Sequence, residues 1–451
     1  MGNKNKEGGK KAGGEASAYH HKSKGGGRKK QAAGGDAPSP AKAAGSLPAP
    51  SVSFNPKDAT DPFELLDMCV AALHDKHAST ATREAALASL AGALEGAVPL
   101  DEAADGRPLV IFALCGAAIK RGTAAPALAR EARLAYRAVG LLALTLRNGG
   151  STEILAESFP VLARALQQAP SSADAATVAA ALDCLAAVTF AGALGPEEAE
   201  RSLKAIMGVV CPNPKSPTAI SGRVSPQVVA ATVSTWTFLV TTAAVTDAQR
   251  KADRAAWAAT VGALAGVLLE AAGEALAVCV ELNLTQYTPR KDMEAVRARV
   301  SDLAIEAAGK GADKTLFLEP AKDLFRQISA YMERGERPRP LVLRTSPDRR
   351  ESIRASTWAK MAQLNFLRRF LAGGFLAHVK GNRLFKETFD VGADDKATLS
   401  IARRKVVLKA MDKGMKMNRE LSWAVKNVYC LPQGGPPESN KPDQLLKLGW
   451  H

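Results

Sequence analysis

The chain has 451 residues and a formal net charge of +15 at pH 7, which is spread unevenly along it. Residues 1–57 hold 11 Lys or Arg against 3 Asp or Glu, residues 58–336 hold 26 against 32, and residues 337–451 hold 23 against 10. Two cationic ends around a mildly acidic centre favour a polyanionic partner, because Lys and Arg displace condensed counterions from nucleic acids.

The composition also argues against several other classes of protein. We find no apolar run of the ~18 residues that a membrane-spanning helix needs, and no apolar signal region at the N-terminus, so we expect no membrane partner. The six cysteines are far apart and form no C-x-x-C pair, so we expect no disulfide framework and no zinc site. We expect no cofactor, no small-molecule substrate and no enzymatic activity, because P-loop, G-x-G-x-x-G, H-E-x-x-H and nucleophile-elbow motifs are all missing.

The N-terminal segment, residues 1–56, is rich in Gly, Lys, Ala and Pro and has almost no large apolar side chain. Such a segment cannot bury enough apolar surface to offset the entropy of ordering, so we predict a disordered basic tail. The tail is either a solubilising segment or, through Lys10-Lys11 and Arg28-Lys29-Lys30, a nuclear-import or RNA-contacting element.

Helical patterns begin at Asp61 and define an array over residues 57–335. Asp61-Pro62, Ser225-Pro226 and Thr288-Pro289 each place an N-cap acceptor before a proline, whose missing N–H is not needed in the first helical turn. Apolar residues then recur at spacings of three and four, which is typical of amphipathic helices. No segment shows a strand pattern, so we expect no strands.

A long series of helices joined by short turns favours an elongated array over one globular core. Abundant alanine allows close helix contacts, so we predict an all-α, HEAT/armadillo-like solenoid. An irregular helical bundle is the alternative, because no sharp motif repeats at a period of about 40 residues. Residues 212–223 contain three prolines and are predicted to form an exposed loop.

Closely spaced prolines between Arg334 and Pro347 end the array and predict a hinge over residues 336–352. A small helical C-terminal module follows over residues 353–395. We expect its first helix at Arg354–Leu371, a break at Gly373-Gly374 and two further short helices up to Phe389.

The module carries large apolar residues at helical spacing. Its aromatic rings could serve as platforms on which bases stack, but rings at this spacing more often belong to a core. We expect His378 to be structural or to contact backbone, since no nucleophile or carboxylate arrangement lies near it in the sequence. The predicted module core consists of Trp358, Leu364, Phe366, Leu367 and Phe370.

Residues 396–430 predict a basic amphipathic helix, and residues 431–451 a flexible tail. Residues 401–430 hold 8 Lys or Arg against 2 Asp or Glu, whereas a helix face that is merely solvated intersperses the two signs. We interpret the cations as a phosphate-contacting row; a solvated face, a membrane surface and a calmodulin-type cleft are the alternatives. The candidate RNA-binding residues are Arg403, Arg404, Lys405, Lys409, Lys413, Lys416 and Arg419.

A family resemblance is carried by Thr357–Gly392, in particular by Trp358-Ala359-Lys360, Gln363–Arg368, Gly373-Gly374, His378, Asn382, Leu384, Phe389 and Val391-Gly392. These residues resemble the C-terminal domain of the interferon-related developmental regulator family, and the alanine-rich array resembles that family's N-terminal armadillo-like domain. The family's basic stretch is usually denser than the one in this chain, and residues 431–451 have no counterpart.

The resemblance implies a non-enzymatic α-helical protein of the cytoplasm and nucleus. Some family members associate with transcriptional co-repressor complexes. Others occupy translationally inactive ribosomes, with a C-terminal helix inside the RNA channels. We therefore expect either a regulator that binds ribosomal RNA through residues 396–430 and stabilises or marks an inactive state, or an armadillo-like adaptor for transcriptional co-regulators.

Overall fold

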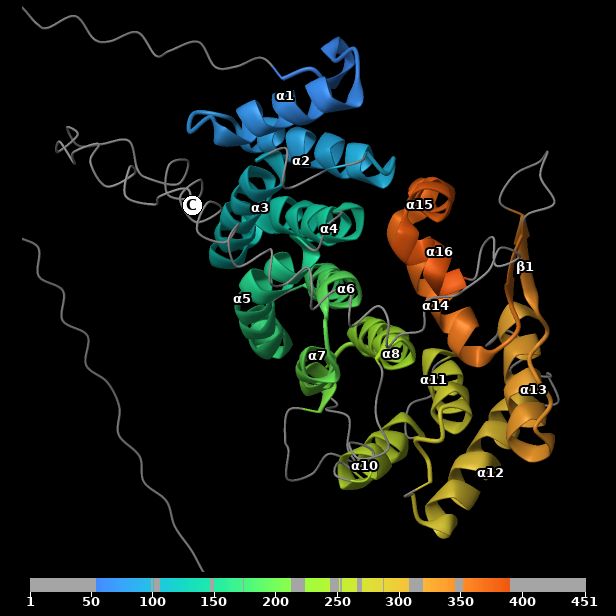
Figure 1. The fold of residues 1–451 in the computed structure, drawn as a ribbon. Coiled ribbons are helices and arrows are strands. Elements are labelled where there is room, and N and C mark those ends of the chain that lie inside the picture. The colour runs from blue at the N-terminus through green and yellow to red at the C-terminus, as the bar shows by residue number, and fades with distance from the viewer. Residues whose placement is uncertain are drawn as a thin grey trace, which may run out of the picture. The chain divides into compact units, whose positions relative to one another are not determined.

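The computed structural model describes twelve parts of the chain (Figure 1), namely residues 54–98, 100, 106–146, 150–172, 174–211, 224–243, 251, 254–265, 270–286, 288–307, 319–344 and 352–389. Several sequence predictions lie outside these residues. They concern the tail up to residue 53, the loop at 212–223, the basic helix at 396–430 and the final segment at 431–451.

The array is built from pairs of helices, and each pair contributes one helix to each of two rows. Row A comprises α2 (Thr80–Glu95), α4 (Ala129–Thr145), α6 (Ala175–Gly192), α8 (Pro226–Thr242), α11 (Glu270–Glu281) and α13 (Glu319–Arg334). Row B comprises α1 (Pro62–His74), α3 (Arg107–Ala124), α5 (Gly150–Ser172), α7 (Pro196–Val210), α10 (Arg254–Ala265) and α12 (Arg290–Ala307). Two 3-10 turns, η1 (Pro56–Asp58) and η2 (Pro126–Leu128), precede α1 and α4.

Contacts between helices follow this order closely. Each row A helix packs on the next one in its row, and each also packs on its own row B partner. Because every unit contacts mainly its neighbours in sequence, the arrangement is that of a helical solenoid. The prediction of an all-α, HEAT/armadillo-like solenoid is confirmed.

The repeat is real but irregular. The row A helices start at residues 80, 129, 175, 226, 270 and 319, so successive starts are 49, 46, 51, 44 and 49 residues apart. The connecting segments vary in length, while the order in which the helices pack stays the same. This variation explains why the sequence shows no sharp motif at a fixed period.

Two of the three predicted proline caps are confirmed. Asp61 accepts from the N–H groups of Phe63 and Glu64, and Ser225 accepts from that of Val228. The third prediction is wrong: α12 begins at Arg290, and Thr288 Oγ1 is buried without a hydrogen-bond partner among the described residues. The carbonyl of Pro289 accepts the first helical hydrogen bonds instead, which moves the start one residue along the chain.

Helix α6 corrects the expectation that no apolar run is long enough to span a membrane. Within the described parts of the chain, α6 has the length and the apolar composition that a membrane-spanning helix needs. Most of α6 is buried, and it packs against α4, α5, α7 and α8. Its apolar character is therefore explained by its place at the centre of the array core.

The expectation of no strands is also wrong. β1 (Leu341–Arg344) pairs antiparallel with β2 (Ser352–Ala355), within the predicted hinge and at the predicted start of the first module helix. Each strand has only four residues, along which buried and exposed side chains alternate. In β2, Ile353 and Ala355 are buried and Arg354 between them is exposed. So short a pattern is hard to see beside the surrounding prolines.

The module consists of α14 (Trp358–Leu371), the 3-10 turn η3 (Ala372–Gly374), α15 (Phe375–Gly381) and α16 (Arg383–Phe389). Helix α14 begins four residues later than predicted, because the Thr357 side chain caps it by accepting from the Lys360 N–H. Figure 1 shows the three helices beside row A, and the contacts place α14 against α8 and α11 and α15 against α2.

Candidate functional site

The module crosses the whole of row A, running back along the array in the direction opposite to the chain. At one end the Trp358 ring lies 6.0 Å from that of Tyr331 in α13. At the other end α15 and η3 pack on α2. Side chains of the module contact all six row A helices, so the six helix pairs and the module form one packed unit.

Three polar side chains of the module bind backbone carbonyls at the ends of row A helices. Gln363 Nε2 donates to the carbonyl oxygen of Thr241 in α8 at 3.1 Å, and Asn382 Nδ2 donates to that of Leu144 in α4 at 2.5 Å. The carbonyl groups in the last turn of a helix have no helical N–H group four residues later to pair with. The module therefore caps the C-termini of α4 and α8 in row A.

His378 makes the third contact of this kind, with Nε2 3.2 Å from the carbonyl oxygen of Leu94 at the end of α2. The side chain is fully buried, and burial lowers its pKa below the ordinary histidine value. A carbonyl only accepts, so Nε2 carries the proton of the neutral ring. The expectation of a backbone-contacting histidine is confirmed.

The start of α14 is held by a carboxylate from the array. Glu281, the last residue of α11, accepts from the N–H groups of Trp358 at 3.1 Å and Ala359 at 2.6 Å. An anion at this position meets the positive end of the helix dipole. The mildly acidic array and the cationic module thus complement each other at their contact.

A second charged contact lies further along α14. The two guanidinium nitrogens of Arg369 lie 2.6 and 2.8 Å from the two carboxylate oxygens of Asp183 in α6. Paired, parallel hydrogen bonds of this kind fix orientation as well as charge. Arg369 therefore takes part in docking the module.

Aromatic packing fills the space between these polar contacts. The rings of Phe366 and Phe238 stack with centroids 4.0 Å apart and an angle of 10° between their planes. Phe385 of α16 meets Phe190 of α6 edge-on at 6.4 Å. The five residues of the predicted module core, Trp358, Leu364, Phe366, Leu367 and Phe370, are all buried.

The module core is therefore not a separate core. Its rings pack against the array as well as against each other, and no ring face among these five residues is open for a nucleic-acid base. What the sequence pattern missed is the partner of the apolar face, which includes Phe238 of α8 and Phe190 of α6.

Gly374 explains the glycine pair in the break after α14. A Cβ atom at this position would lie 2.0 Å from the carbonyl oxygen of Glu95, whereas one at Gly373 would meet nothing within 4 Å. Only Gly374 therefore needs to be glycine for close approach. It brings the module backbone directly onto the end of α2.

The candidate RNA-binding residues, from Arg403 to Arg419, lie outside the described residues. The described residues that precede them in the chain end with α16. Phe389 is buried at the end of α16 with its ring 6.0 Å from that of Phe375, and Lys360 Nζ donates to the carbonyl of Thr388. The described chain therefore ends at an anchored point beside the first turn of α14, and the cationic segment follows from residue 396.

Other chemistry in the described parts of the chain is structural. The buried carboxylate of Glu131 is paired with Arg83 and Arg121. The described residues as a whole include no group of three His, Cys, Asp or Glu side chains that could hold a metal ion.

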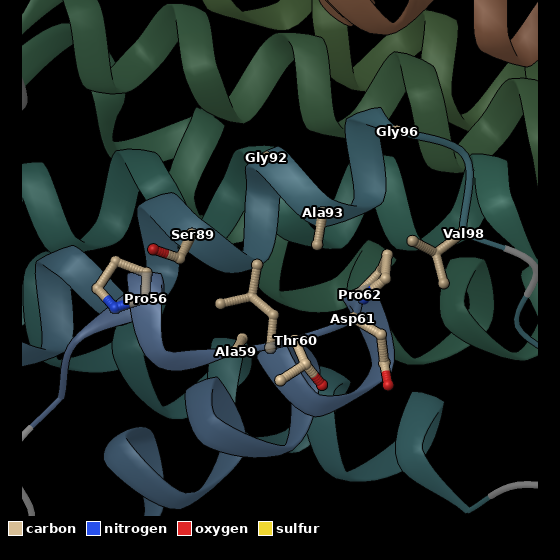
Figure 2. Close-up of a pocket in the computed structure, with 11 residues that line it drawn as sticks. Pro56, Ala59, Thr60, Asp61, Pro62, Ser89, Gly92, Ala93, Gly96 and Val98 are labelled. Atoms are coloured by element: carbon tan, nitrogen blue, oxygen red, sulfur yellow. The ribbon is translucent and has the colours of Figure 1, made fainter.

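A cavity of about 480 Å³ lies between η1, the start of α1 and the second half of α2 (Figure 2). Its walls are mainly apolar or backbone, including Pro56, Leu65 and Val98. Asp61, which also lines it, is already engaged as the cap of α1. The cavity brings no catalytic groups together.

Comparison with known protein families decides the identity of the array. The profile of the interferon-related developmental regulator family matches residues 43–333. The chain belongs to this family. The match covers the solenoid and ends before Thr357–Gly392, the stretch on which the sequence resemblance was based. The module is thus linked to the family region through the contacts described above.

The interferon-related developmental regulator family is not known as an enzyme family. No curated protein matches the chain.

Proposed function

We propose that this member of the interferon-related developmental regulator family is a non-enzymatic ribosome-binding regulator. Residues 396–430 contact ribosomal RNA through Arg403, Arg404, Lys405, Lys409, Lys413, Lys416 and Arg419. The bound protein stabilises or marks a translationally inactive state. Such a role requires the protein in the cytoplasm, and the basic clusters of the N-terminal tail are compatible with a second location in the nucleus.

One observation carries the proposal. Polar and aromatic groups of the module, such as Gln363, Asn382 and Phe366, are engaged in contacts with row A. The strongly cationic segment begins at residue 396, after the buried Phe389 and the acidic stretch at 390–395. The strong cation excess of the C-terminal region lies in the segment with 8 Lys or Arg against 2 Asp or Glu over residues 401–430, so this segment suits a polyanion best. The array with its docked module then acts as a rigid body that carries this segment.

The same observation weakens the adaptor alternative. An α-solenoid commonly binds its ligands along one row of helices. In this chain the module itself covers row A, from α2 at one end to α13 at the other. A transcriptional co-regulator would have to bind elsewhere or displace the module, so we favour the ribosomal role.

Sucrose-gradient sedimentation of the full chain with ribosomes tests the proposal. The test variant changes Lys405, Lys409, Lys413, Lys416 and Arg419 to Ala. The matched control changes five exposed lysines of the array, Lys57, Lys76, Lys120, Lys251 and Lys291, to Ala, which removes the same charge.

We expect the wild-type and control chains to sediment with ribosomes at low salt and the test variant to stay near the top of the gradient. Affinity should fall steeply with salt, by a slope of about 0.7–0.9 per phosphate contact in a plot of log affinity against log salt. Unchanged sedimentation of the test variant, or a wild-type chain that never sediments, would refute the proposal.

A further inference from the structure

The hairpin β1–β2 has two unlike faces. Ile353 and Ala355 are buried on the face turned toward the module, where β2 packs against α14 and α16. On the opposite face Arg344 and Arg354 are exposed, and so is Val342, with 56% of its surface accessible. A region that the sequence predicts as a hinge is thus a folded element with one side fully presented to solvent.

The two arginines lie on the same face and on neighbouring strands. The register pairs Val342 with Arg354 and Arg344 with Ser352, so all four side chains point to one side. Arg344 and Arg354 are therefore diagonal neighbours, which in an antiparallel pair are separated by roughly 7–8 Å. Like charges so placed repel each other unless an anion lies between them.

Carboxylates do not compensate this pair among the described residues. Nearby arginines behave differently: Arg334 is paired with Glu333 and Glu336, and Arg339 is paired with Asp323. Arg344 and Arg354 form no ion pair within the described part of the chain. Because Arg334 and Arg339 are paired with carboxylates and Arg344 and Arg354 are not, the exposed face of the hairpin is the cationic side of residues 334–355.

The position of the hairpin relates it to the proposed RNA contact. β2 packs against α16, which ends at Phe389. The cationic segment begins at residue 396, after a short stretch that contains Asp390, Asp394 and Asp395. Helix α16 also presents Lys386 to solvent. Exposed cations that form no ion pair within the described residues therefore occur on two elements in contact, and one of them, α16, precedes in sequence the segment that we propose binds ribosomal RNA.

We propose that the exposed face of the hairpin, through Arg344 and Arg354, is a second contact with RNA phosphates. The inference rests on the proposed function and extends it from the segment after Phe389 to a folded part of the chain. Guanidinium groups suit this role because their paired donors match two phosphate oxygens. Two paired strands hold the backbone of both residues at a fixed spacing, so little backbone freedom is lost on binding.

The test compares four full-length proteins: wild type, Arg344→Ala/Arg354→Ala, the five-residue segment variant described above, and a control. The control is Lys291→Ala/Arg297→Ala on α12, which removes the same charge from exposed positions of the array. Affinity for purified ribosomes is measured over a range of salt concentrations. Circular dichroism and thermal unfolding show whether each variant keeps the fold.

We expect the hairpin variant to bind more weakly, with a salt slope smaller than that of the wild type by about 1.4–1.8, as for two lost phosphate contacts. The control should match the wild type. Replacing both arginines by lysine should restore most of the slope, because the charge returns without the paired donors.

The outcomes separate the two proposals. If the segment variant loses binding and the folded hairpin variant binds like the wild type, the hairpin contact is refuted and the ribosomal function stands. If neither variant changes binding, both are refuted. If affinity falls in the hairpin variant with no change in salt slope, the two arginines contact a protein surface instead of phosphates, and the phosphate contact is refuted.

Discussion

His378 Nε2 lies 3.2 Å from the carbonyl oxygen of Leu94, a residue 284 positions earlier in the chain. This bond joins the last helices of the described chain to the first helix pair of the solenoid. Together with Asn382 on Leu144 and Gln363 on Thr241, it shows that the C-terminal module is docked along row A by bonds to helix ends. The following predictions test this docking and its consequences.

Substitution at Gly374 should undock the module where substitution at its neighbour does not. Gly374→Ala forces a Cβ atom to within 2.0 Å of the Glu95 carbonyl oxygen, so either α2 or the module must move. We expect the free energy of unfolding to fall by about 1–3 kcal/mol, as for other overpacked contacts. Gly373→Ala is the control and should change it by less than about 0.5 kcal/mol. Equal effects of the two changes in chemical denaturation would contradict the close approach.

Docking should weaken in acid through His378. Burial lowers the pKa of this side chain, so the unfolded chain takes up the proton first as the pH falls below the ordinary value of about 6.5. The free energy of unfolding should therefore decrease below about pH 6.5 and stop decreasing once the folded histidine is also protonated.

The variant His378→Gln isolates this effect, since an amide can donate to Leu94 but does not titrate. Glu95 lies near the ring, and burial raises the pKa of Glu274 in the same interface, which favours the folded state in acid. The quantity to measure is thus the difference between wild type and variant at pH 7.5 and pH 5. A wild-type chain that loses no more stability than the variant would show that His378 is accessible or charged.

Glu281 should stabilise the module through its charge at the start of α14. Glu281→Gln removes the negative charge and leaves one N–H, of Trp358 or Ala359, without an acceptor. We expect a loss of about 1–3 kcal/mol, as for hydrogen bonds to charged groups. The control Glu294→Gln breaks a surface pair with Arg290 on α12 and should be close to neutral. Similar thermal unfolding of both variants would argue against the cap.

Thiol labelling should report the packing of the solenoid. Burial raises the pKa of Cys69, Cys115 and Cys279 to about 12 and also raises that of Cys184, so these thiols are both covered and protonated. In a Cys430→Ser background, Cys211 should react first in the native chain because it is only half-buried. The other four should react only on unfolding. Rapid native labelling of any of these four would contradict the core described above.

The sequence predicts the fold class and the apolar residues of the module, because helical spacing and caps are local signals. It fails where the deciding contact is distant. The pattern around Arg354 predicts a helix, yet pairing with β1 and burial of Ile353 make that segment a strand. Nothing in the sequence around Gln363 indicates that its side chain binds the end of α8. In the same way, the sequence does not reveal the repeated order of the row A helices, because the segments that connect them differ in length.

The central claim is that the module is committed to the array and that the cationic segment after Phe389 contacts ribosomal RNA. Ultraviolet cross-linking of the full chain to ribosomes, followed by mapping of the cross-linked peptides, tests it most directly. We predict cross-links within residues 401–430 and none at Trp358, Phe366 or Phe370. Cross-links at these buried rings, with none beyond Phe389, would contradict the account.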